Sequence, residues 1–176
     1  MAGLVSQERL QPSLLDRLRD DEPTELRESL EARVLNKTQL RAAVLRDMTW
    51  LFNAVREEPD IESDDRERYD MWQRASAARE SVLNFGMPAL SGRSLAATDF
   101  AVLQERIRIT IMRFEPRIDP KTLKVEIIND TPGQQTLNMR VIIKGSLWNQ
   151  PVPLELLLSA DVNVDTGQAS VRDMRG

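Results

Sequence analysis

Apolar side chains recur at helical spacing through the first two thirds of the chain and at alternate positions through the last third. The helical stripes are clearest over residues 40–55 and 100–114, where apolar residues return every three or four positions. From Leu123 onward the period falls to two, which is the period of a β-strand with one buried face. This order predicts an α+β fold, with N-terminal helices followed by a small, mainly antiparallel β-sheet.

Four strands are predicted, separated by turns that contain Gly, Pro, Asn and Asp. They cover residues 123–127, 137–143, 154–164 and 169–171, and a longer connection from Gly145 to Pro153 separates the second from the third. Ile128, Ile142 and Leu157 fall on the face opposite to the main apolar alternation. Either a helix covers this second face or the face belongs to an interface. The last strand is also a candidate for an open edge that pairs with another chain.

The chain divides into an N-terminal docking segment, residues 1–23, and one α+β domain, residues 24–176. The segment carries Leu14, Leu15 and Leu18 at the spacing of a short amphipathic helix, and a charged run follows. This helix either packs back on the domain or docks on a partner through those leucines.

Inside the domain, the helix over residues 40–55 is expected to end near Pro59, and a solvated loop is expected over residues 57–70. The loop is acidic, but it has neither the ligand spacing nor the glycine of a calcium loop, so we expect no metal site there. A further helix is expected after a cap at Thr98 or Asp99.

The composition is that of one soluble domain and narrows the possible functions. The chain has 176 residues, 41% apolar and 30% charged, with a net charge of −4, which gives no reason to expect nucleic acid or an anionic membrane as a partner. It contains no cysteine and no histidine, which excludes disulfides, thiolate metal sites and the commonest acid–base group. The glycines are too scattered for a nucleotide-binding loop, so no cofactor is expected.

Neither a signal peptide nor a membrane-spanning run is present, so we expect a cytoplasmic protein without direct membrane insertion.

A carboxylate pair, of the kind used in glycoside hydrolysis, is the catalytic scheme of note that this composition still permits. The chain has 28 acidic residues, so pairs are always available, but Glu115 is the acid that its position marks out. Aromatic residues, which sugar-binding sites usually display, make up 5% of the chain. A carboxylate-dependent hydrolase is the alternative to a non-enzymatic binding role.

The sequence Glu115-Pro116-Arg117 stands where the helical period changes to the strand period. Proline disfavours helical conformation in the residue before it and fixes its own φ, so the preceding helix should end at Phe114 or Glu115 and the corner should be rigid. The guanidinium of Arg117 can bind carboxylates or carbonyls through two parallel hydrogen bonds. Arg117 therefore either pairs with Glu115 and the end of the helix, or binds a partner.

With the flanking residues Phe114 and Ile118, this corner resembles the Glu-Pro-Arg signature of the gene 25-like family of phage-type baseplate wedge proteins, and it is most similar to the type VI secretion members of that family. Three more segments are similar to the family in the same order, at residues 13–18, 46–53 and 81–88. Met48 and Phe52 stand where leucine is more usual in the family.

The resemblance implies a structural, non-enzymatic component of the cytoplasmic baseplate of a type VI secretion contractile injection machine. It implies that Glu115, Pro116 and Arg117 bind the wedge proteins TssF and TssG, and TssK is a further candidate partner. The sheet is expected to face the sheath proteins TssB and TssC, so that the subunit links the wedge complex to the first sheath ring and helps to initiate sheath assembly. Some family members carry a lysozyme-like label, which keeps the alternative of a carboxylate-dependent peptidoglycan hydrolase open.

Overall fold

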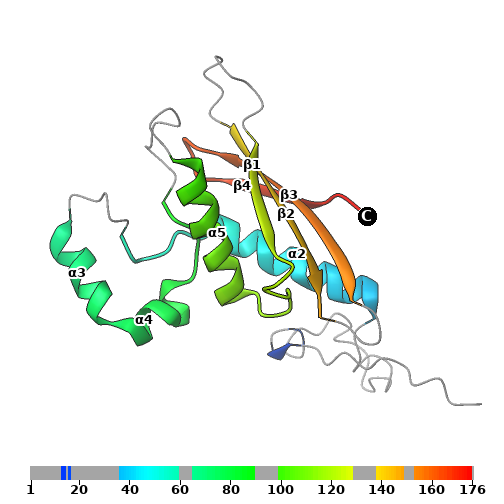
Figure 1. Ribbon diagram of the computed structural model, residues 1–176, viewed down its shortest axis with the longest axis horizontal. Helices are drawn as coiled ribbons and strands as arrows, with labels where there is room; N and C mark the ends of the chain where they lie inside the picture. Colours follow the sequence, from blue (N-terminus) through cyan, green and yellow to red (C-terminus); the bar gives the residue numbers. More distant parts are fainter. Residues whose placement is uncertain are drawn as a thin grey trace, which may run out of the picture.

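The computed structural model describes residues 13–14, 16, 36–59, 65–89, 99–128, 138–148 and 153–175. Helices come first in the described chain and four strands come last, which confirms the predicted α+β order (Figure 1). The helical elements are α2 (Lys37–Asn53), α3 (Arg66–Arg74), α4 (Ser76–Glu80), the 3₁₀ turn η1 (Val82–Asn84) and α5 (Phe100–Phe114). The strands are β1 (Lys124–Ile128), β2 (Asn138–Leu147), β3 (Leu154–Asn163) and β4 (Ala169–Asp173). Most of the predicted docking segment, residues 1–23, lies outside the described residues.

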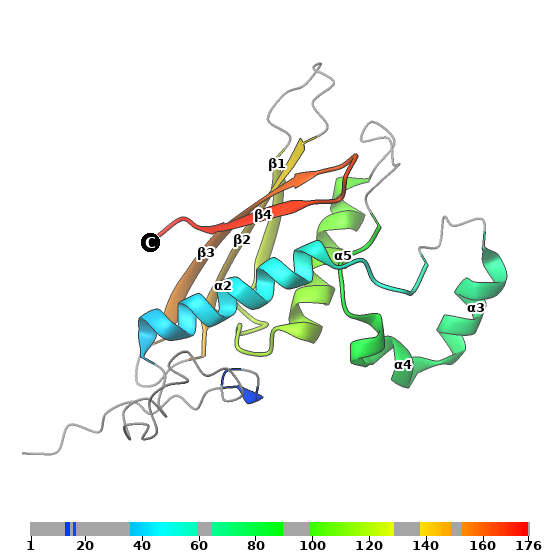
Figure 2. The ribbon, with the colours of Figure 1, turned by 180° about the vertical axis from the view of Figure 1, so that it is seen from behind.

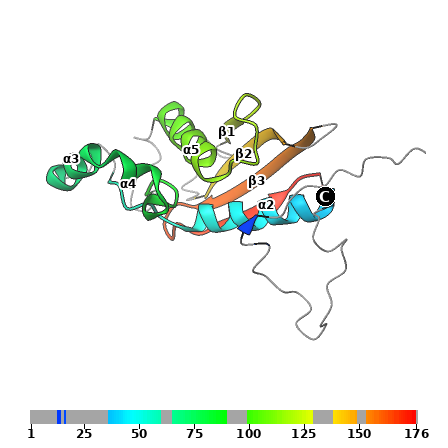
Figure 3. The same ribbon diagram turned by 90° about the horizontal axis from the view of Figure 1, so that it is seen from below.

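The strands form one antiparallel sheet in the order β1-β2-β3-β4. Their alternating apolar residues share one face, where Val141, Ile143 and Leu158 have no exposed surface. Helix α2 contacts β3 and β4, and α5 contacts β1, so the two helices lie against different parts of the sheet (Figures 2 and 3). The apolar stripes of both helices join this face of the sheet in a single hydrophobic core.

The opposite face of the sheet carries charged side chains. Ion pairs join neighbouring strands across it, between Glu126 and Lys144 and between Asp161 and both Arg140 and Arg172. The stems of such long side chains shield apolar neighbours from water, and Ile142 is only 7% exposed. Ile128, by contrast, is 41% exposed. A helix over Ile128, Ile142 and Leu157 was one of two sequence-based alternatives, and it is wrong for the described helices because their apolar stripes pack on the other face.

Helix α2 begins at a well-formed cap and ends earlier than predicted. Asn36 and Gln39 exchange side-chain-to-backbone hydrogen bonds of 2.8 and 2.9 Å, which is a capping box. At the other end Ala54 is already extended, because its carbonyl accepts a hydrogen bond from the N–H of Met87 at 2.8 Å. The prediction that the helix ends near Pro59 is therefore wrong, since backbone pairing with a distant segment stops the helix before the proline.

Helix α3 replaces the last five residues, 66–70, of the solvated loop that was predicted over residues 57–70. Asp65 caps the helix by accepting a hydrogen bond from the backbone N–H of Arg68 at 2.9 Å. Arg66 pairs with Asp70 one turn further on. None of the side chains of α3 is buried, so hydrophobic periodicity does not reveal this helix. It lies to one side of the molecule, away from the sheet (Figures 1 and 2).

Strand β2 runs further than predicted, and its extra residues reach the corner that follows α5. Gly145, which was predicted to open a connecting loop, lies inside the strand. A Cβ added to Gly145 would lie 3.1 Å from Cγ2 of Ile118, so glycine lets the segment after the corner approach closely. Ile118 forms an isolated antiparallel bridge with Leu147, the last residue of β2. The sheet and the corner are therefore one rigid unit.

A buried carboxylate connects the α4–η1 region to the chain that follows α2. Glu58 is 7% exposed and accepts hydrogen bonds from Arg79 at 2.8 Å, Asn84 at 3.0 Å and Gln73 at 3.1 Å. Asn84, which is 1% exposed, in turn accepts a bond from the backbone N–H of Glu58 at 2.9 Å. Buried polar groups are stable when they are partnered in this way, so polar contacts hold this region in place.

Replacing Gly86 by alanine should destabilise the fold strongly. Gly86 has a φ of +134°, which L-residues rarely adopt, and an added Cβ would lie 2.7 Å from backbone atoms of Ala54 and Arg56. We expect the free energy of unfolding, measured by urea denaturation, to fall by about 3 kcal/mol.

Gly167→Ala is the matched control, because Gly167 also has a positive φ, +71°, but has no atom within 4 Å of an added Cβ. This control should lose only about 1 kcal/mol, from backbone strain alone. Equal losses in the two variants would show that steric exclusion around Gly86 plays no part.

Candidate functional site

The Glu-Pro-Arg corner is a tight turn that is fastened to the end of β2. Helix α5 ends at Phe114, as predicted, and the N–H of Ile118 donates to the carbonyl of Glu115 across the turn at 3.2 Å. The N–H of Trp148 donates to the carbonyl of Arg117 at 2.8 Å. Backbone bonds therefore fix both sides of the corner, and the side chains of the corner project from a rigid frame.

Within the corner, the guanidinium of Arg117 holds the carboxylate of Glu115. Nε of Arg117 donates to Oε1 at 2.6 Å and Nη2 donates to Oε2, which is the two-bond geometry favoured by arginine and carboxylate. Glu115 is only 2% exposed, so Arg117 compensates a carboxylate that has lost nearly all contact with water. Of the two roles that the sequence leaves open for Arg117, internal pairing with Glu115 is therefore present.

Helix α2 adds a second guanidinium and a second carboxylate from adjacent positions. Asp47 accepts hydrogen bonds from Nη2 of Arg117 and, through its other oxygen, from Nε of Arg46 at 2.8 Å. Asp47 thus bridges the two arginines. The guanidinium of Arg46 also lies 5.2 Å from the ring centre of Trp50, at a distance suited to a cation–π contact.

A third carboxylate, that of Asp16, reaches the same arginines from the N-terminal segment. Its Oδ1 accepts a hydrogen bond from Nη2 of Arg46 at 2.7 Å, and its Oδ2 accepts bonds from the hydroxyl and the N–H of Ser13 at 2.6 and 3.1 Å. The side chain of Asp16 is 8% exposed. These five charged residues, Asp16, Arg46, Asp47, Glu115 and Arg117, are called the corner cluster below.

Hydrogen bonding keeps members of the corner cluster charged. Burial alone would lower the pKa of Arg117, but its hydrogen bond and attraction to Glu115, followed by those to Asp47, outweigh burial and raise that pKa. Burial alone would likewise raise the pKa of Asp16, but hydrogen bonds from Ser13 and Arg46 lower it below its ordinary value of 3.8. Arg117 and Asp16 are therefore both ionised at neutral pH.

Of the other residues predicted to contact partners, the structure describes Pro116 and Leu14. Pro116 is exposed at the tip of the corner. Leu14 is 73% exposed, and Leu15 and Leu18 lie outside the described residues. Because Asp16 belongs to the corner cluster, the segment that carries Leu14 is tied to the corner.

Sequence reasoning did not place Asp16, Arg46 and Asp47 in the site. The contact between Arg117 and Asp47 spans 70 positions and that between Arg46 and Asp16 spans 30, so no local spacing rule connects them. The available signal was that all three lie in segments that resemble one family.

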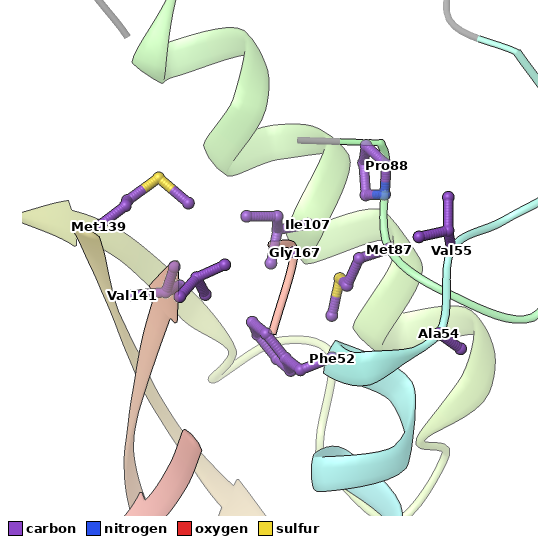
Figure 4. A pocket seen from close by; sticks show the side chains of 10 residues that line it. Phe52, Ala54, Val55, Met87, Pro88, Ile107, Met139, Val141 and Gly167 are labelled. Carbon is purple, nitrogen blue, oxygen red and sulfur yellow. The ribbon is translucent and has the colours of Figure 1, made fainter. Parts of the chain in front are cut away.

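A small apolar pocket lies between the end of α2, helix α5 and the core face of the sheet (Figure 4). Phe52, Met87, Ile107 and Val141 are among the side chains that line it. Its volume is about 20 Å³, the space of about one water molecule, and no titratable side chain lines it. Among the described residues, no group of three or more acidic side chains is placed to hold a metal ion. The pocket therefore offers no acid–base chemistry, and the corner cluster is the candidate site.

Comparison with known protein families identifies the family of this domain. The family model described as baseplate wedge protein gp25 matches residues 38–152, more than half of the chain, and this range includes the corner, α5 and the first two strands. The chain belongs to the gp25 baseplate wedge family. Membership makes this protein a structural component of a baseplate, and it confirms the gene 25-like resemblance and fold predicted from the sequence. No curated protein and no solved structure is significantly similar to the chain.

Four members of the corner cluster lie within the range that matches the gp25 family, and Asp16 lies before it. The described helices include none that is long and apolar enough to cross a membrane.

Replacing Arg117 by alanine should destabilise this gp25-family domain, because Glu115 would stay buried without a counter-charge. Breaking a buried ion pair in this way is expected to lower the free energy of unfolding by about 3 kcal/mol. Urea denaturation of the purified variant measures the loss.

Arg108→Ala is the matched control on the same stretch of chain. Arg108 pairs with Glu105 at 2.6 Å on an exposed side of α5, where such a pair contributes only about 0.5 kcal/mol. If the two variants unfold at the same urea concentration, burial of Glu115 does not depend on Arg117.

Proposed function

We propose that this gp25-family chain is the baseplate subunit TssE of a type VI secretion system, acting in the cytoplasm as a structural link in a contractile injection machine. In this role it binds the wedge proteins TssF and TssG, with TssK as a further candidate partner. It also binds the sheath proteins TssB and TssC and helps to start the first sheath ring. The observation that carries the proposal is a rigid charged corner beside a sheet with an open edge, in a chain of a baseplate wedge family.

The corner has the properties of a protein-binding surface. Pro116 is exposed, and the side chain of Arg117 keeps 22% of its surface accessible although its charge is paired. Trp50, 50% exposed, lies against Arg46 in the same cluster. Tryptophan and arginine are enriched among the residues that dominate binding energy at interfaces. A pre-ordered surface also binds at a lower entropic cost than a mobile one, which supports the corner as the wedge contact.

The outer edge of β4 is the surface that we assign to the sheath. The N–H and carbonyl of Ala169 bond to the side chain of Asn53 at 3.0 and 2.9 Å, so they point away from β3. In an antiparallel strand, backbone groups two positions apart point the same way. The backbone groups of Val171 and Asp173 therefore also face outward, where a strand of another chain can pair with them.

The opposite edge of the sheet, β1, is also bonded to a helix. Helix α5 contacts β1, and its Gln104 accepts a hydrogen bond from the outward N–H of Ile127 at 2.9 Å. Each edge strand therefore has one outward position bonded to a helix side chain. Strand β4 has two further outward positions, Val171 and Asp173, whereas β1 has one, Val125, so β4 offers the longer template for strand addition and we assign the sheath contact to it.

We further propose that the chain is not an enzyme. Glu115, the candidate catalytic acid, accepts hydrogen bonds from Arg117 at both of its carboxylate oxygens. A carboxylate held in this way at 2% exposure is poorly placed to protonate a glycosidic oxygen. Turnover of peptidoglycan by the purified protein, abolished by Glu115→Gln, would overturn this part of the proposal.

Arg117→Lys should weaken capture of the wedge proteins while the fold is kept. Lysine keeps the positive charge beside Glu115 but loses the planar fork that holds two carboxylates in fixed directions. We expect the amount of TssF and TssG that co-purifies with the tagged chain to fall about tenfold, with circular dichroism unchanged.

Arg108→Lys is the control for this pull-down, and it should capture the wedge proteins as the unchanged chain does. If Arg117→Lys captures TssF and TssG as well as the control, the corner is not the wedge contact. The amount of TssK that co-purifies is measured in the same pull-down.

Val171→Pro should remove sheath binding. The substitution deletes an outward N–H of β4 and leaves the hydrogen bonds to β3 in place, and edge strands tolerate proline. We expect co-purification of TssB and TssC to fall at least about tenfold, because strand addition depends on main-chain bonds.

Val125→Pro makes the equivalent change on the outward side of β1 and separates the two edges. A loss of sheath capture in Val125→Pro, with normal capture in Val171→Pro, would place the sheath contact at β1 instead of β4 and contradict the proposal.

A further inference from the structure

One donor of the corner cluster lacks an acceptor. Nη1 of Arg117 is buried and forms no hydrogen bond within the part of the chain that the structure describes. Oδ2 of Asp16 lies 3.9 Å from it, which is too far for a hydrogen bond. A buried charged donor without an acceptor is unfavourable, so a carboxylate placed closer to this atom would bind more favourably than Asp16 does.

Asp16 is prevented from moving closer by its own segment. Its Oδ2 is the oxygen that faces Arg117, and the same oxygen accepts both hydrogen bonds from Ser13. A shift toward Nη1 would break those bonds. Asp16 therefore accepts a hydrogen bond from Arg46 but leaves Nη1 of Arg117 without an acceptor.

Asp16 is also the carboxylate of the corner cluster that can leave with least disturbance. Asp47 is part of α2 and Glu115 is part of the corner, so neither can leave without local unfolding. Asp16 comes from a segment that lies 30 positions before its partner Arg46. Its departure leaves two guanidiniums with two carboxylates, so the remaining charges balance.

We propose that Arg46 and Arg117 form an exchangeable carboxylate-binding site, which Asp16 fills from within the chain and an Asp or Glu side chain of a partner protein takes over. A carboxylate that is free of Ser13 can accept hydrogen bonds from Arg46 and from Nη1 of Arg117 together. Its entry releases the N-terminal segment that carries the exposed Leu14. That the partner is a wedge protein rests on the proposed function, whereas the site itself does not.

The first experiment tests whether Asp16 holds the segment. The chain contains no cysteine, so Leu14→Cys provides a unique position for a nitroxide spin label. Asp16→Asn in this background should raise the ratio of mobile to immobile label about tenfold, the size expected from loss of a charge-assisted hydrogen bond. Asp165→Asn, in the exposed turn before β4, is the charge-matched control and should leave the spectrum unchanged.

The second experiment tests exchange on the isolated full-length protein. The probe is an acetylated peptide of residues 10–20 with Ala in place of Ser13, in one version with Asp and in another with Asn at the position of Asp16. The Asp version should bind the full-length Asp16→Asn protein at least about tenfold more tightly than the Asn version does. Adding Arg46→Gln to the protein should remove this preference.

Each result decides a part of the proposal. Unchanged label mobility in Asp16→Asn would overturn the internal contact, and equal binding of the two peptides would overturn the exchangeable site. Both measurements use the isolated chain. If both succeed and TssF and TssG are not captured, the proposed wedge contact fails while the carboxylate site stands.

Discussion

The burial of one ionised carboxylate, that of Glu115, is the constraint on which the rest of the structure depends. A carboxylate that is 2% exposed is tolerated only with a counter-charge and hydrogen bonds. Arg117, which is two residues further along the chain, supplies the counter-charge and the hydrogen bonds. It can reach Glu115 only because the chain turns at Pro116. The same guanidinium binds Asp47 on α2, and the backbone of the turn bonds to the end of β2. Two helices and the sheet therefore meet at a single ion pair.

Buried ion pairs of this kind suit a domain whose structure must stay fixed. The apolar core lies on one face of the sheet, and a second buried carboxylate, Glu58, secures the α4–η1 region. Helices α2 and α5 cover the core on the inner face, and the outer face carries ion pairs, so the core is buried within the chain itself. The described domain is thus a preassembled block, which suits the proposed link between the wedge complex and the sheath.

The two proposed contact surfaces are physically connected through this block. The corner is bonded to the end of β2, and β4 lies two strands away in the same sheet. A load applied at the corner therefore reaches β4 through the hydrogen bonds of β2 and β3, without a flexible linker between them. Asp16 adds a connection of a different kind, because it ties a separate segment to the corner through a contact that a competing carboxylate can replace.

The sequence by itself determined that helices precede strands, that a cap lies at Thr98 or Asp99, and that α5 ends at the Glu-Pro-Arg corner, because spacing, caps and proline act within a few residues. It also determined that Glu115 and Arg117 stand together at a corner. Only the tertiary structure decided that Asp47 and Asp16 complete the cluster, that α2 stops at Asn53, and that β2 continues through Gly145. These features depend on groups brought together from distant positions, and a buried charge selects its partners by proximity in space, which no local pattern records.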